Sequence, residues 1–597
     1  MEGAGERSGS HNSVFSPGEA LGRVISVSGP QATIGFLSSM RRSAHELRPT
    51  VGNFVGIVSG RSVLIGVITE VSIDIPAAVR EQGYFAAGKM DLLGEIKEEQ
   101  SGRPCFARGV REYPAVGAAG ALLSQQALEL VYGGSGADMV RIGDLNQDST
   151  VGAHIDVQET LTKHFAVLGT TGVGKSTAVA LILQQMLGAR RDLRIFLLDA
   201  HNEYAQCFGD VAYVVNPGNM KLPFWLFNFD ELVDVIFGGR PGDPEELEIL
   251  AEVLPLAKAS YSRIRGAQDR SWAKRSAAGF TVDTPVPYVL QDLVALIDER
   301  MGKLENRSSR MKFHKLISRI ETVRNDPRYG FMFANANVGG DTMGEVVSQL
   351  FRLPAHGRPM TIMQLAGFPA EVVDAVVSVL GRMAFEFGLW SDGAVPLLFV
   401  CEEAHRYASA DRNLGFGPTR KAISRIAKEG RKYGVFLRLV TQRPAELDAT
   451  ILSQCSTLFV MRMANDRDQA IVRAAVSDGA GNLLDFVPSL GTAEVFAFGE
   501  GIAMPARLRF TQLPAHLLPR SEAVGKAKID ARAGANPEFI ASVIDRWRGA
   551  MMSQKLGADD AAEAEPVVLA KTMSPQLSPG SNPPRPSLLK KPLIPGL

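Results

Sequence analysis

The residues best suited to chemistry lie in the segment HFAVLGTTGVGKSTAVALIL, at positions 164–183. Gly169, Gly174, Lys175 and Ser176 fit the spacing G-x-x-x-x-G-K-[ST] between an apolar segment and a helix-forming one. Backbone N–H groups in such a loop surround phosphate, the lysine reaches the β and γ oxygens, and the serine hydroxyl ligates Mg²⁺. The pattern predicts a nucleoside triphosphate site formed by Gly169, Thr170, Thr171, Gly172, Val173, Gly174, Lys175, Ser176 and Thr177.

Two adjacent acids end a second apolar segment, PLLFVCEEAH at 396–405. We expect Glu402 to hold Mg²⁺ and Glu403 to polarise the attacking water. Two acids at this place favour hydrolysis over group transfer. The alternative is a pair of solvated carboxylates at a strand end.

The next apolar segment ends in VTQRP at 440–444, which puts Gln442 at a strand tip. An amide there senses the γ-phosphate and the water, or else Thr441 and Gln442 only cap the strand. A phosphate loop, remote acids and a polar strand tip in this order are typical of RecA-like ATPases with an additional strand.

Basic residues crowd the segment TRKAISRIAKEGRKYG at 419–434. A ring-shaped ATPase needs an arginine from the neighbouring subunit to stabilise charge on the transferred phosphate. Arg425 and Arg431 are both candidates, and a solvated basic face is the alternative.

A third polar cluster, DAHNEY at 199–204, follows the apolar segment after the phosphate loop. If that strand continues, the period of two puts Asp199, His201 and Glu203 on one side of it. We expect Asp199 and Glu203 to order Mg²⁺ or the subunit edge. His201 is expected to be a hydrogen-bonded site residue rather than a metal ligand.

The elements that position these residues alternate strand and helix, which indicates a parallel sheet. The predicted fold is α/β: a RecA-like additional-strand P-loop ATPase core with an N-terminal small β-barrel and an inserted helical bundle. The expected segments are a disordered N-terminus (1–17), the barrel (18–135), the first part of the core (136–230), the helical insertion (231–330), the second part of the core (331–525), a C-terminal helix (526–555) and a disordered Pro-rich tail (556–597). Asp243, Pro244 and Glu246 predict an N-cap, a first-turn proline and a capping-box acid for a helix in the insertion. Thr492–Gly499 is expected to form an edge hairpin.

The composition excludes several classes of protein. The chain has 597 residues, with 64 basic and 64 acidic side chains, so no global field attracts nucleic acid or an anionic membrane. Its four cysteines form no CxxC pair, which argues against a zinc knuckle or a disulfide framework. We find no apolar leader and no run of about 18 apolar residues. A cytoplasmic protein without membrane segments is expected.

Taken together, the motifs LGTTGVGKST, DAHNEY, EEAHRY, ISRIAKEGRKYG and TQRPAELDATILSQCSTLFVMRMANDRDQ resemble the HerA branch of the HerA/FtsK hexameric translocases. The resemblance is dense over 164–476, and the N-terminal strands resemble the HAS barrel of that family. It implies a hexameric ring of one chain that uses ATP and Mg²⁺ to translocate along, or unwind, double-stranded DNA. The resemblance also implies that Glu402 is the Walker B acid, Glu403 the catalytic base and Gln442 the sensor. It places the trans arginine in the segment RIAKEGRK. In the family an arginine often precedes the phosphate-loop strand; here Lys163 stands nearby, and it cannot make a bidentate phosphate contact.

The resemblance also implies a partner, either a nuclease or an anti-phage effector, with a role in DNA repair or antiviral defence. A basic stretch at 305–324 is a candidate for DNA contact, although a solvated face of the insertion is favoured for it. A second hypothesis is a nucleotide-gated ring that assembles and regulates an effector without processive movement on DNA. A coupling ATPase of conjugation or secretion is a third hypothesis, which the missing membrane anchor disfavours.

Overall fold

A computed structural model shows the fold. It describes residues 20–37, 49–73, 80–81, 83–99, 101, 103–134, 136–266, 279–303, 307–333, 340–368, 370–411, 416–476, 481–520, 540–541, 544–545 and 548. The predicted disordered segments 1–17 and 556–597 lie outside the described residues, as does most of the predicted helix at 526–555.

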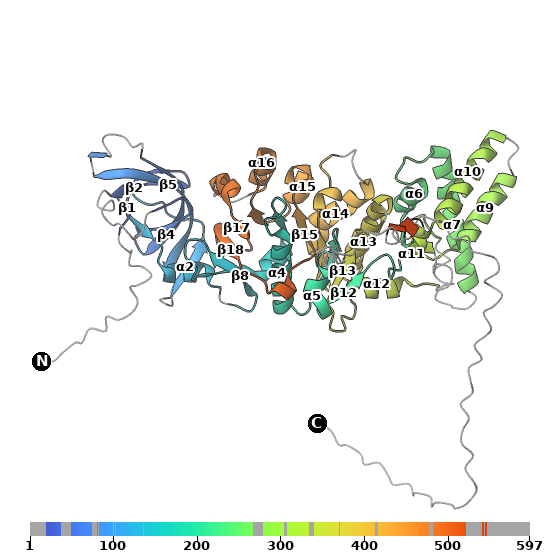
Figure 1. Ribbon diagram of the computed structural model, residues 1–597, viewed down its shortest axis with the longest axis horizontal. Helices are drawn as coiled ribbons and strands as arrows, with labels where there is room; N and C mark the ends of the chain where they lie inside the picture. The colour runs from blue at the N-terminus through green and yellow to red at the C-terminus, as the bar shows by residue number, and fades with distance from the viewer. Residues whose placement is uncertain are drawn as a thin grey trace, which may run out of the picture. The chain divides into compact units, whose positions relative to one another are not determined.

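The N-terminal strands form a closed antiparallel barrel (Figure 1). In the described part of the chain, six strands follow the order β2-β1-β7-β3-β4-β5, the β2–β5 pairing closes the ring, and β6 extends β5. Alternating apolar residues such as Ile34, Ile57 and Met90 fill the interior. The strands are β1 (Gly22–Ser28), β2 (Gln31–Leu37), β3 (Phe54–Ser59), β4 (Ser62–Ser72), β5 (Tyr84–Glu98), β6 (Pro104–Arg108) and β7 (Ala119–Leu122).

The second sheet carries the predicted site at one edge. Its order over the described residues is β12-β13-β11-β14-β15-β10-β16-β17-β18-β8-β9, and the strands from β12 to β16 are parallel. The strands are β8 (Met139–Leu145), β9 (Gly152–Asp156), β10 (Phe165–Leu168), β11 (Arg194–Asp199), β12 (Ala212–Val215), β13 (Met360–Gln364), β14 (Leu397–Cys401), β15 (Val435–Thr441), β16 (Thr457–Met461), β17 (Glu494–Gly499) and β18 (Ala506–Phe510). Strand β15 therefore separates the phosphate-loop strand β10 from the acid strand β14, which is the additional-strand order that the sequence predicted.

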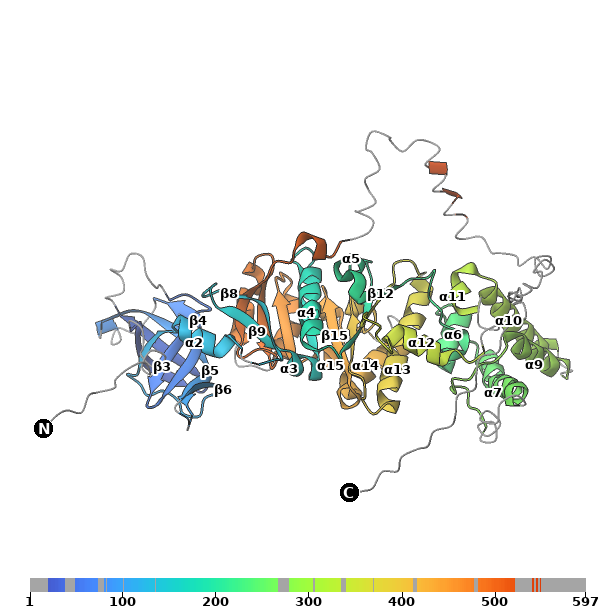
Figure 2. The same cartoon turned by 90° about the horizontal axis from the view of Figure 1, so that it is seen from below.

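Helices cover both faces of this sheet (Figures 1 and 2). Helix α4 (Lys175–Ala189) lies over the face from which Arg438 points, because the Arg438 guanidinium donates to the Val179 carbonyl at 3.4 Å. Helices α13 (Ala370–Trp390) and α14 (Gly417–Glu429) pack together on the opposite face. The parallel strands are thus buried on both sides, which explains their continuous apolar sequences. Smaller helices around the sheet are α2 (Gln125–Tyr132), α3 (Val157–Thr162), α5 (Ala205–Phe208), α15 (Ala449–Leu452) and α16 (Asp466–Ala475).

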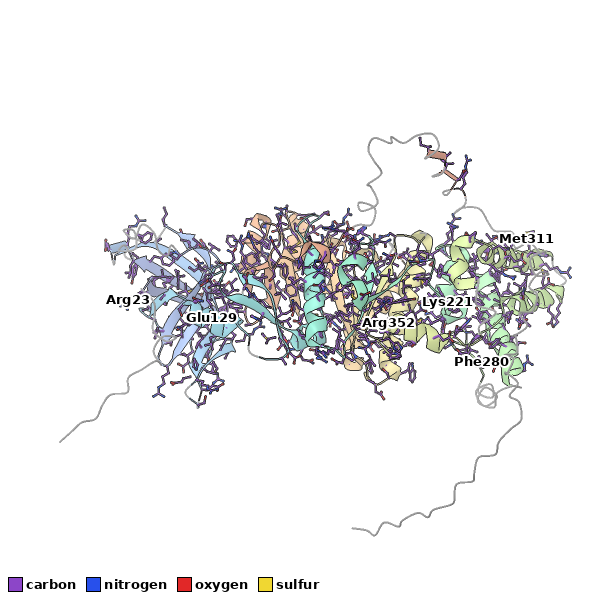
Figure 3. All side chains as sticks on the ribbon, turned by 60° about the horizontal axis from the view of Figure 1, so that its bottom comes forward. Arg23, Glu129, Lys221, Phe280, Met311 and Arg352 are labelled. Atoms are coloured by element: carbon purple, nitrogen blue, oxygen red, sulfur yellow. The ribbon has the colours of Figure 1, made fainter. Side chains whose placement is uncertain are left out.

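The helical insertion lies between β12 and β13, which nevertheless pair directly. It contains α6 (Phe229–Phe237), α7 (Pro244–Gly266), α9 (Leu290–Gly302), α10 (Arg307–Arg324) and α11 (Gly330–Phe333), and α12 (Met343–Phe351) follows against the core strands. Met311, which is 63% exposed, lies on the outer side of α10 (Figure 3). In the part of the chain that the structure describes, no helix has both the length and the apolar character needed to cross a bilayer.

Two local expectations are wrong. Helix α7 does begin at Pro244, but the buried Glu246 carboxylate lies 3.2 Å from Arg319 Nε of α10 instead of completing a capping box. The segment ending at Gly499 is not an edge hairpin, because β17 pairs with β16 on one side and β18 on the other. Each difference arises from a partner distant in the sequence, which no local pattern contains.

The basic stretch at 305–324 is partly engaged within the insertion. Lys312 pairs with Asp243 at the start of α7, and Arg319 stacks 4.9 Å above the Phe237 ring while facing Glu246. Lys312 and Arg319 therefore pack within the insertion, whereas Arg310 and Lys315 are exposed, as on the solvated face that we favoured.

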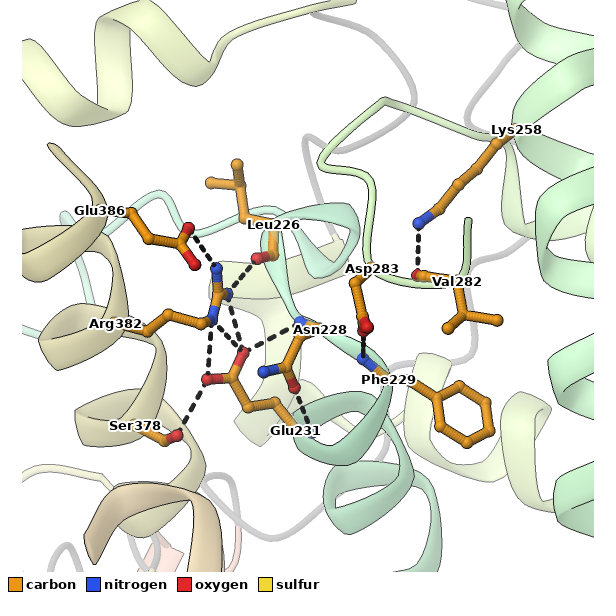
Figure 4. Close-up of polar contacts among 10 residues, drawn as sticks. All are labelled: Leu226, Asn228, Phe229, Glu231, Lys258, Val282, Asp283, Ser378, Arg382 and Glu386. Atoms are coloured by element: carbon orange, nitrogen blue, oxygen red, sulfur yellow. Dashed lines mark hydrogen bonds and ion pairs between the residues drawn. The ribbon is translucent and has the colours of Figure 1, made fainter. Parts of the chain in front are cut away.

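A buried ion pair joins the insertion to the core (Figure 4). Arg382 of α13 donates to Glu231 of α6 at 2.8 Å and to the Leu226 carbonyl at 2.6 Å. Glu231 also completes a capping box with Asn228 and accepts from the Ser378 hydroxyl at 2.9 Å. The Glu231 carboxylate thus takes part in the N-terminal cap of α6 and also fixes that helix against α13.

A buried lysine holds a loop beside this joint (Figure 4). Lys258 Nζ of α7 donates to the carbonyls of Val282 at 2.6 Å and Thr284 at 2.7 Å. Between them, Asp283 accepts from the Phe229 amide, at the first turn of α6, at 2.9 Å. The 281–284 segment therefore connects α7 to the start of α6.

Replacing Arg382 with Met should destabilise α6, because it leaves the Glu231 carboxylate buried without its cation. Loss of one partner of a buried pair costs about 3–5 kcal/mol. Hydrogen exchange of the α6 backbone amides should accelerate by about 100-fold or more. Lys421→Ala is the matched control, since its exposed pair with Asp230 at 3.8 Å is worth under about 1 kcal/mol. Equal exchange rates in both variants would contradict the assignment.

Candidate nucleotide-binding site

The loop between β10 and α4 has the backbone that a phosphate cradle needs. Gly172 and Gly174 have φ values of 80° and 100°, which only glycine adopts without strain. At Gly169 a Cβ atom would lie 2.8 Å from the Met461 Cβ, so the loop packs closely on β16. No side chain caps the N-terminus of α4 among the described residues, which leaves its first N–H groups available to an anion.

Lys175 lies inside this loop. Its ammonium donates to the Thr170 carbonyl at 2.8 Å. Burial lowers the pKa of Lys175, while the nearby Glu403, Glu402 and Glu203 act in the opposite direction. The lysine is thus held at the loop by backbone and by acids.

The two predicted acids follow the last residue of β14, Cys401. Glu402 is 4% exposed, and the Tyr204 hydroxyl donates to its Oε1 at 3.1 Å. Burial raises the pKa of Glu402 well above its usual value, and Asp199, Glu203 and Glu403 add to the shift. Its other oxygen, Oε2, is buried and has no hydrogen-bond partner among the described residues.

These residues fit a divalent cation. A buried, unpartnered carboxylate oxygen at Glu402 and the Ser176 hydroxyl are the hard oxygen ligands that Mg²⁺ prefers. Within the described ranges, no group of three or more His, Cys, Asp or Glu side chains is arranged to hold a metal by itself. Mg²⁺ at phosphate sites needs only one or two protein ligands, because substrate phosphates and water supply the rest. When bound, it would neutralise charge that develops on the phosphate.

The DAHNEY segment does not present three side chains on one side. Strand β11 ends at Asp199, and the chain then turns through Asn202 at φ 56°. The Asp199 carboxylate accepts the N–H groups of Glu203 at 3.1 Å and Tyr204 at 3.0 Å, so it holds this turn. Glu203 instead accepts from the Ser176 hydroxyl at 3.1 Å, and His201 turns toward Glu403.

Gln442 lies where the sequence predicts. Strand β15 ends at Thr441 between β10 and β14, and Leu168, the last residue of β10, pairs with Thr441. The Gln442 side-chain carbonyl accepts a hydrogen bond from the Thr171 hydroxyl of the phosphate loop. The strand tip and the loop are therefore in direct contact.

Neither predicted arginine lies at the phosphate loop of its own chain. Arg425 stacks 4.1 Å from the Phe385 ring and lines an open pocket of about 270 Å³ between α6, α13 and α14. Arg431 precedes β15, at the end of the sheet opposite the loop. Lys163 lies at that same end and pairs with Glu159 at 2.7 Å. An action in trans stays a prediction for both arginines.

Sequence reasoning missed two residues with defined contacts. Tyr204 binds Glu402, although its motif gave no reason to assign it a role. Arg438 is fully buried in β15, 4.7 Å from the Phe165 ring, and burial lowers its pKa to about 9. A single charge within the apolar run VFLRLVT was the available signal for Arg438.

The sheet order and this site define the class of protein: a P-loop ATPase with an additional strand between the phosphate loop and the acids. Residues 140–384 match the family model described as "Helicase HerA, central domain". The chain is 27% identical over 458 residues to the DNA double-strand break repair helicase HerA of Pyrococcus furiosus, covering 71% of this chain and 76% of that protein. It is 26% identical to the HerA of Sulfolobus acidocaldarius, covering 68% of this chain and 75% of that protein.

Among solved structures, VirB4 of Thermoanaerobacter pseudethanolicus is 13% identical, with a TM-score of 0.46, covering 64% of this chain and 98% of that one. The family match and the curated relatives agree with the predicted resemblance. The chain is an ATPase that is similar to the HerA helicases.

Tyr204→Phe should weaken the site's affinity for Mg²⁺, because it removes the hydrogen bond that orients Glu402. Loss of such a supporting contact typically costs about 10- to 100-fold in metal affinity. The Mg²⁺ concentration for half-maximal ATP hydrolysis should rise accordingly. Tyr407→Phe serves as the control, since the buried Tyr407 hydroxyl has no hydrogen-bond partner within the described part of the chain. Matching Mg²⁺ dependence in the two variants would rule out this role.

Proposed function

We propose that the protein is an ATP-driven, hexameric double-stranded DNA translocase or helicase that acts with a partner nuclease or an anti-phage effector. The proposal rests on one observation above all: the phosphate loop, two acids and the tip of the intervening strand meet at one edge of the sheet. The curated relatives named HerA, a DNA double-strand break repair helicase, support DNA as the substrate.

Within this proposal the residues have separate roles. The loop Gly169–Thr177 binds ATP, with Lys175 on the phosphates. Ser176 and Glu402 hold Mg²⁺, Glu403 accepts the proton of the attacking water, and Gln442 senses the γ-phosphate. Arg425 or Arg431 of a neighbouring copy stabilises the transferred phosphate.

A second function uses the same site. In it the ring changes nucleotide state to assemble and regulate an effector, without processive movement along DNA. The neutral charge balance of 64 basic and 64 acidic residues leaves this alternative open, because no extended field toward DNA follows from composition.

Two substitutions should separate binding from hydrolysis. Lys175→Ala should lose nucleotide binding, because the phosphates lose their cation. Glu403→Gln should keep ATP bound and slow hydrolysis by about 100-fold or more, as expected when a general base is removed. Binding of a fluorescent ATP analogue and release of phosphate measure the two effects. Normal hydrolysis by Glu403→Gln would remove the base assignment.

DNA dependence distinguishes the two functions. We expect linear double-stranded DNA to stimulate steady-state ATP hydrolysis in a particle with the mass of six 64.3 kDa chains by light scattering. Stimulation should fall steeply with salt, since contacts to the phosphate backbone release counterions. Glu403→Gln controls for contaminating ATPase. A ring that hydrolyses ATP regardless of DNA would favour the effector scaffold, and co-purification from the native cell tests for the partner.

A further inference from the structure

The Glu403 carboxylate lies between two imidazole rings from different parts of the chain. His201 Nε2, in the turn after β11, is 3.4 Å from Glu403 Oε1. His405 Nδ1, in the 3-10 turn Ala404–Arg406 after β14, is 3.4 Å from Glu403 Oε2. Each carboxylate oxygen thus faces one ring nitrogen.

Glu403 has little else to orient it. Its backbone has φ 50°, a left-handed conformation that costs a non-glycine residue energy and is typical of functional sites. Its Oε2 is buried, and the described residues supply no hydrogen bond to it. A buried carboxylate oxygen without a donor is stabilised when a hydrogen-bond donor reaches it. His405 Nδ1 lies 3.4 Å from this oxygen.

His405 has a second partner at closer range. Its Nδ1 lies 2.9 Å from Thr441 Oγ1, and that hydroxyl oxygen also accepts the Arg443 N–H at 3.0 Å. A single N–H on Nδ1 cannot make a full hydrogen bond to Thr441 and to Glu403 at the same time. Burial lowers the pKa of His405, which favours the neutral ring with one N–H.

Thr441 is connected to the phosphate loop through its neighbour Gln442. It is the last residue of β15 and immediately precedes Gln442, whose side chain binds the Thr171 hydroxyl. The strand tip that competes for His405 is therefore in direct contact with the phosphate loop.

We propose that His405 is a positioning residue that shares its Nδ1–H between Thr441 Oγ1 and Glu403 Oε2, and so sets the orientation of Glu403 by the position of the β15 tip. In the present structure Nδ1 lies closer to Thr441 Oγ1, at 2.9 Å, than to Glu403 Oε2, at 3.4 Å. When the tip withdraws, His405 donates to Glu403 and fixes the carboxylate for proton transfer. His201 supports the other oxygen, and its effect is smaller because its side chain is 51% exposed. The inference rests on the proposed role of Glu403.

The test compares a substitution that removes the Nδ1–H donor of His405 with one that keeps an N–H donor near the same place. His405→Ala should lower kcat for ATP hydrolysis by about 10- to 100-fold, as expected for a misplaced catalytic group. The KM for ATP and the affinity for a fluorescent ATP analogue should stay within about twofold, because the described polar partners of His405 are Thr441 and Glu403 rather than loop residues. His405→Asn places an amide N–H near the Nδ1 position and should retain kcat within about threefold of the wild type.

Thr441 supplies an independent measurement. Thr441→Val removes the competing acceptor and should raise hydrolysis without DNA by about threefold, whereas Thr441→Ser should not. In the His405→Ala background the effect of Thr441→Val should disappear, since it acts through His405. His201→Ala should lower kcat less than His405→Ala does.

The outcomes separate this inference from the proposed function. Normal hydrolysis by Glu403→Gln would overturn both. A stalled Glu403→Gln with wild-type kcat in His405→Ala would overturn only the positioning role. Loss of nucleotide affinity in both His405 variants would also overturn it, because the histidine would then maintain local structure rather than orient Glu403.

Discussion

The burial of the Glu402 carboxylate is the constraint on which the rest of the site depends. Glu402 follows a strand covered on both faces, and Asp199, Glu203 and Glu403 all contribute charge of the same sign. Among the described groups around it, Lys175 supplies positive charge and Tyr204 supplies a hydrogen bond. A nearby cation stabilises the ionised form of a carboxyl held in this way. The site therefore suits a nucleotide bound with Mg²⁺.

The strand order connects this local arrangement to the phosphate loop. Because Cys401 pairs with Leu439, the end of β15 lies level with the acids that follow β14. The same strand pairs with β10, so its tip also meets the phosphate loop. One strand therefore contacts both the loop that holds phosphate and the residues that flank Glu403.

The helical insertion is attached without disturbing this edge. Strands β12 and β13 pair directly, and the insertion joins α13 through the Arg382–Glu231 pair. Helix α13 leads into β14, the strand that carries both acids. Arg425 lies at the same joint, in the pocket that Glu231 and Arg382 line. The insertion thus contacts both the helix that precedes the acid strand and the pocket that holds one candidate trans arginine.

The sequence by itself determined the features that depend on local backbone. The phosphate loop follows from the glycines at positive φ between a strand and a helix, and Glu402, Glu403 and Gln442 follow from polar residues at the ends of apolar strands. The start of α7 at Pro244 follows from capping chemistry. In each of these cases the residues that set the conformation are neighbours in the chain.

Only the tertiary structure decided which side chains these residues meet. The partner of Glu246 is Arg319, the Asp199 carboxylate holds a backbone turn, and β17 lies inside the sheet. The contact of His405 with Thr441 likewise joins the turn after β14 to the end of β15, and these two strands are neighbours in the sheet. Periodicity and capping rules describe one segment at a time, whereas these contacts depend on strand order and helix packing between distant segments.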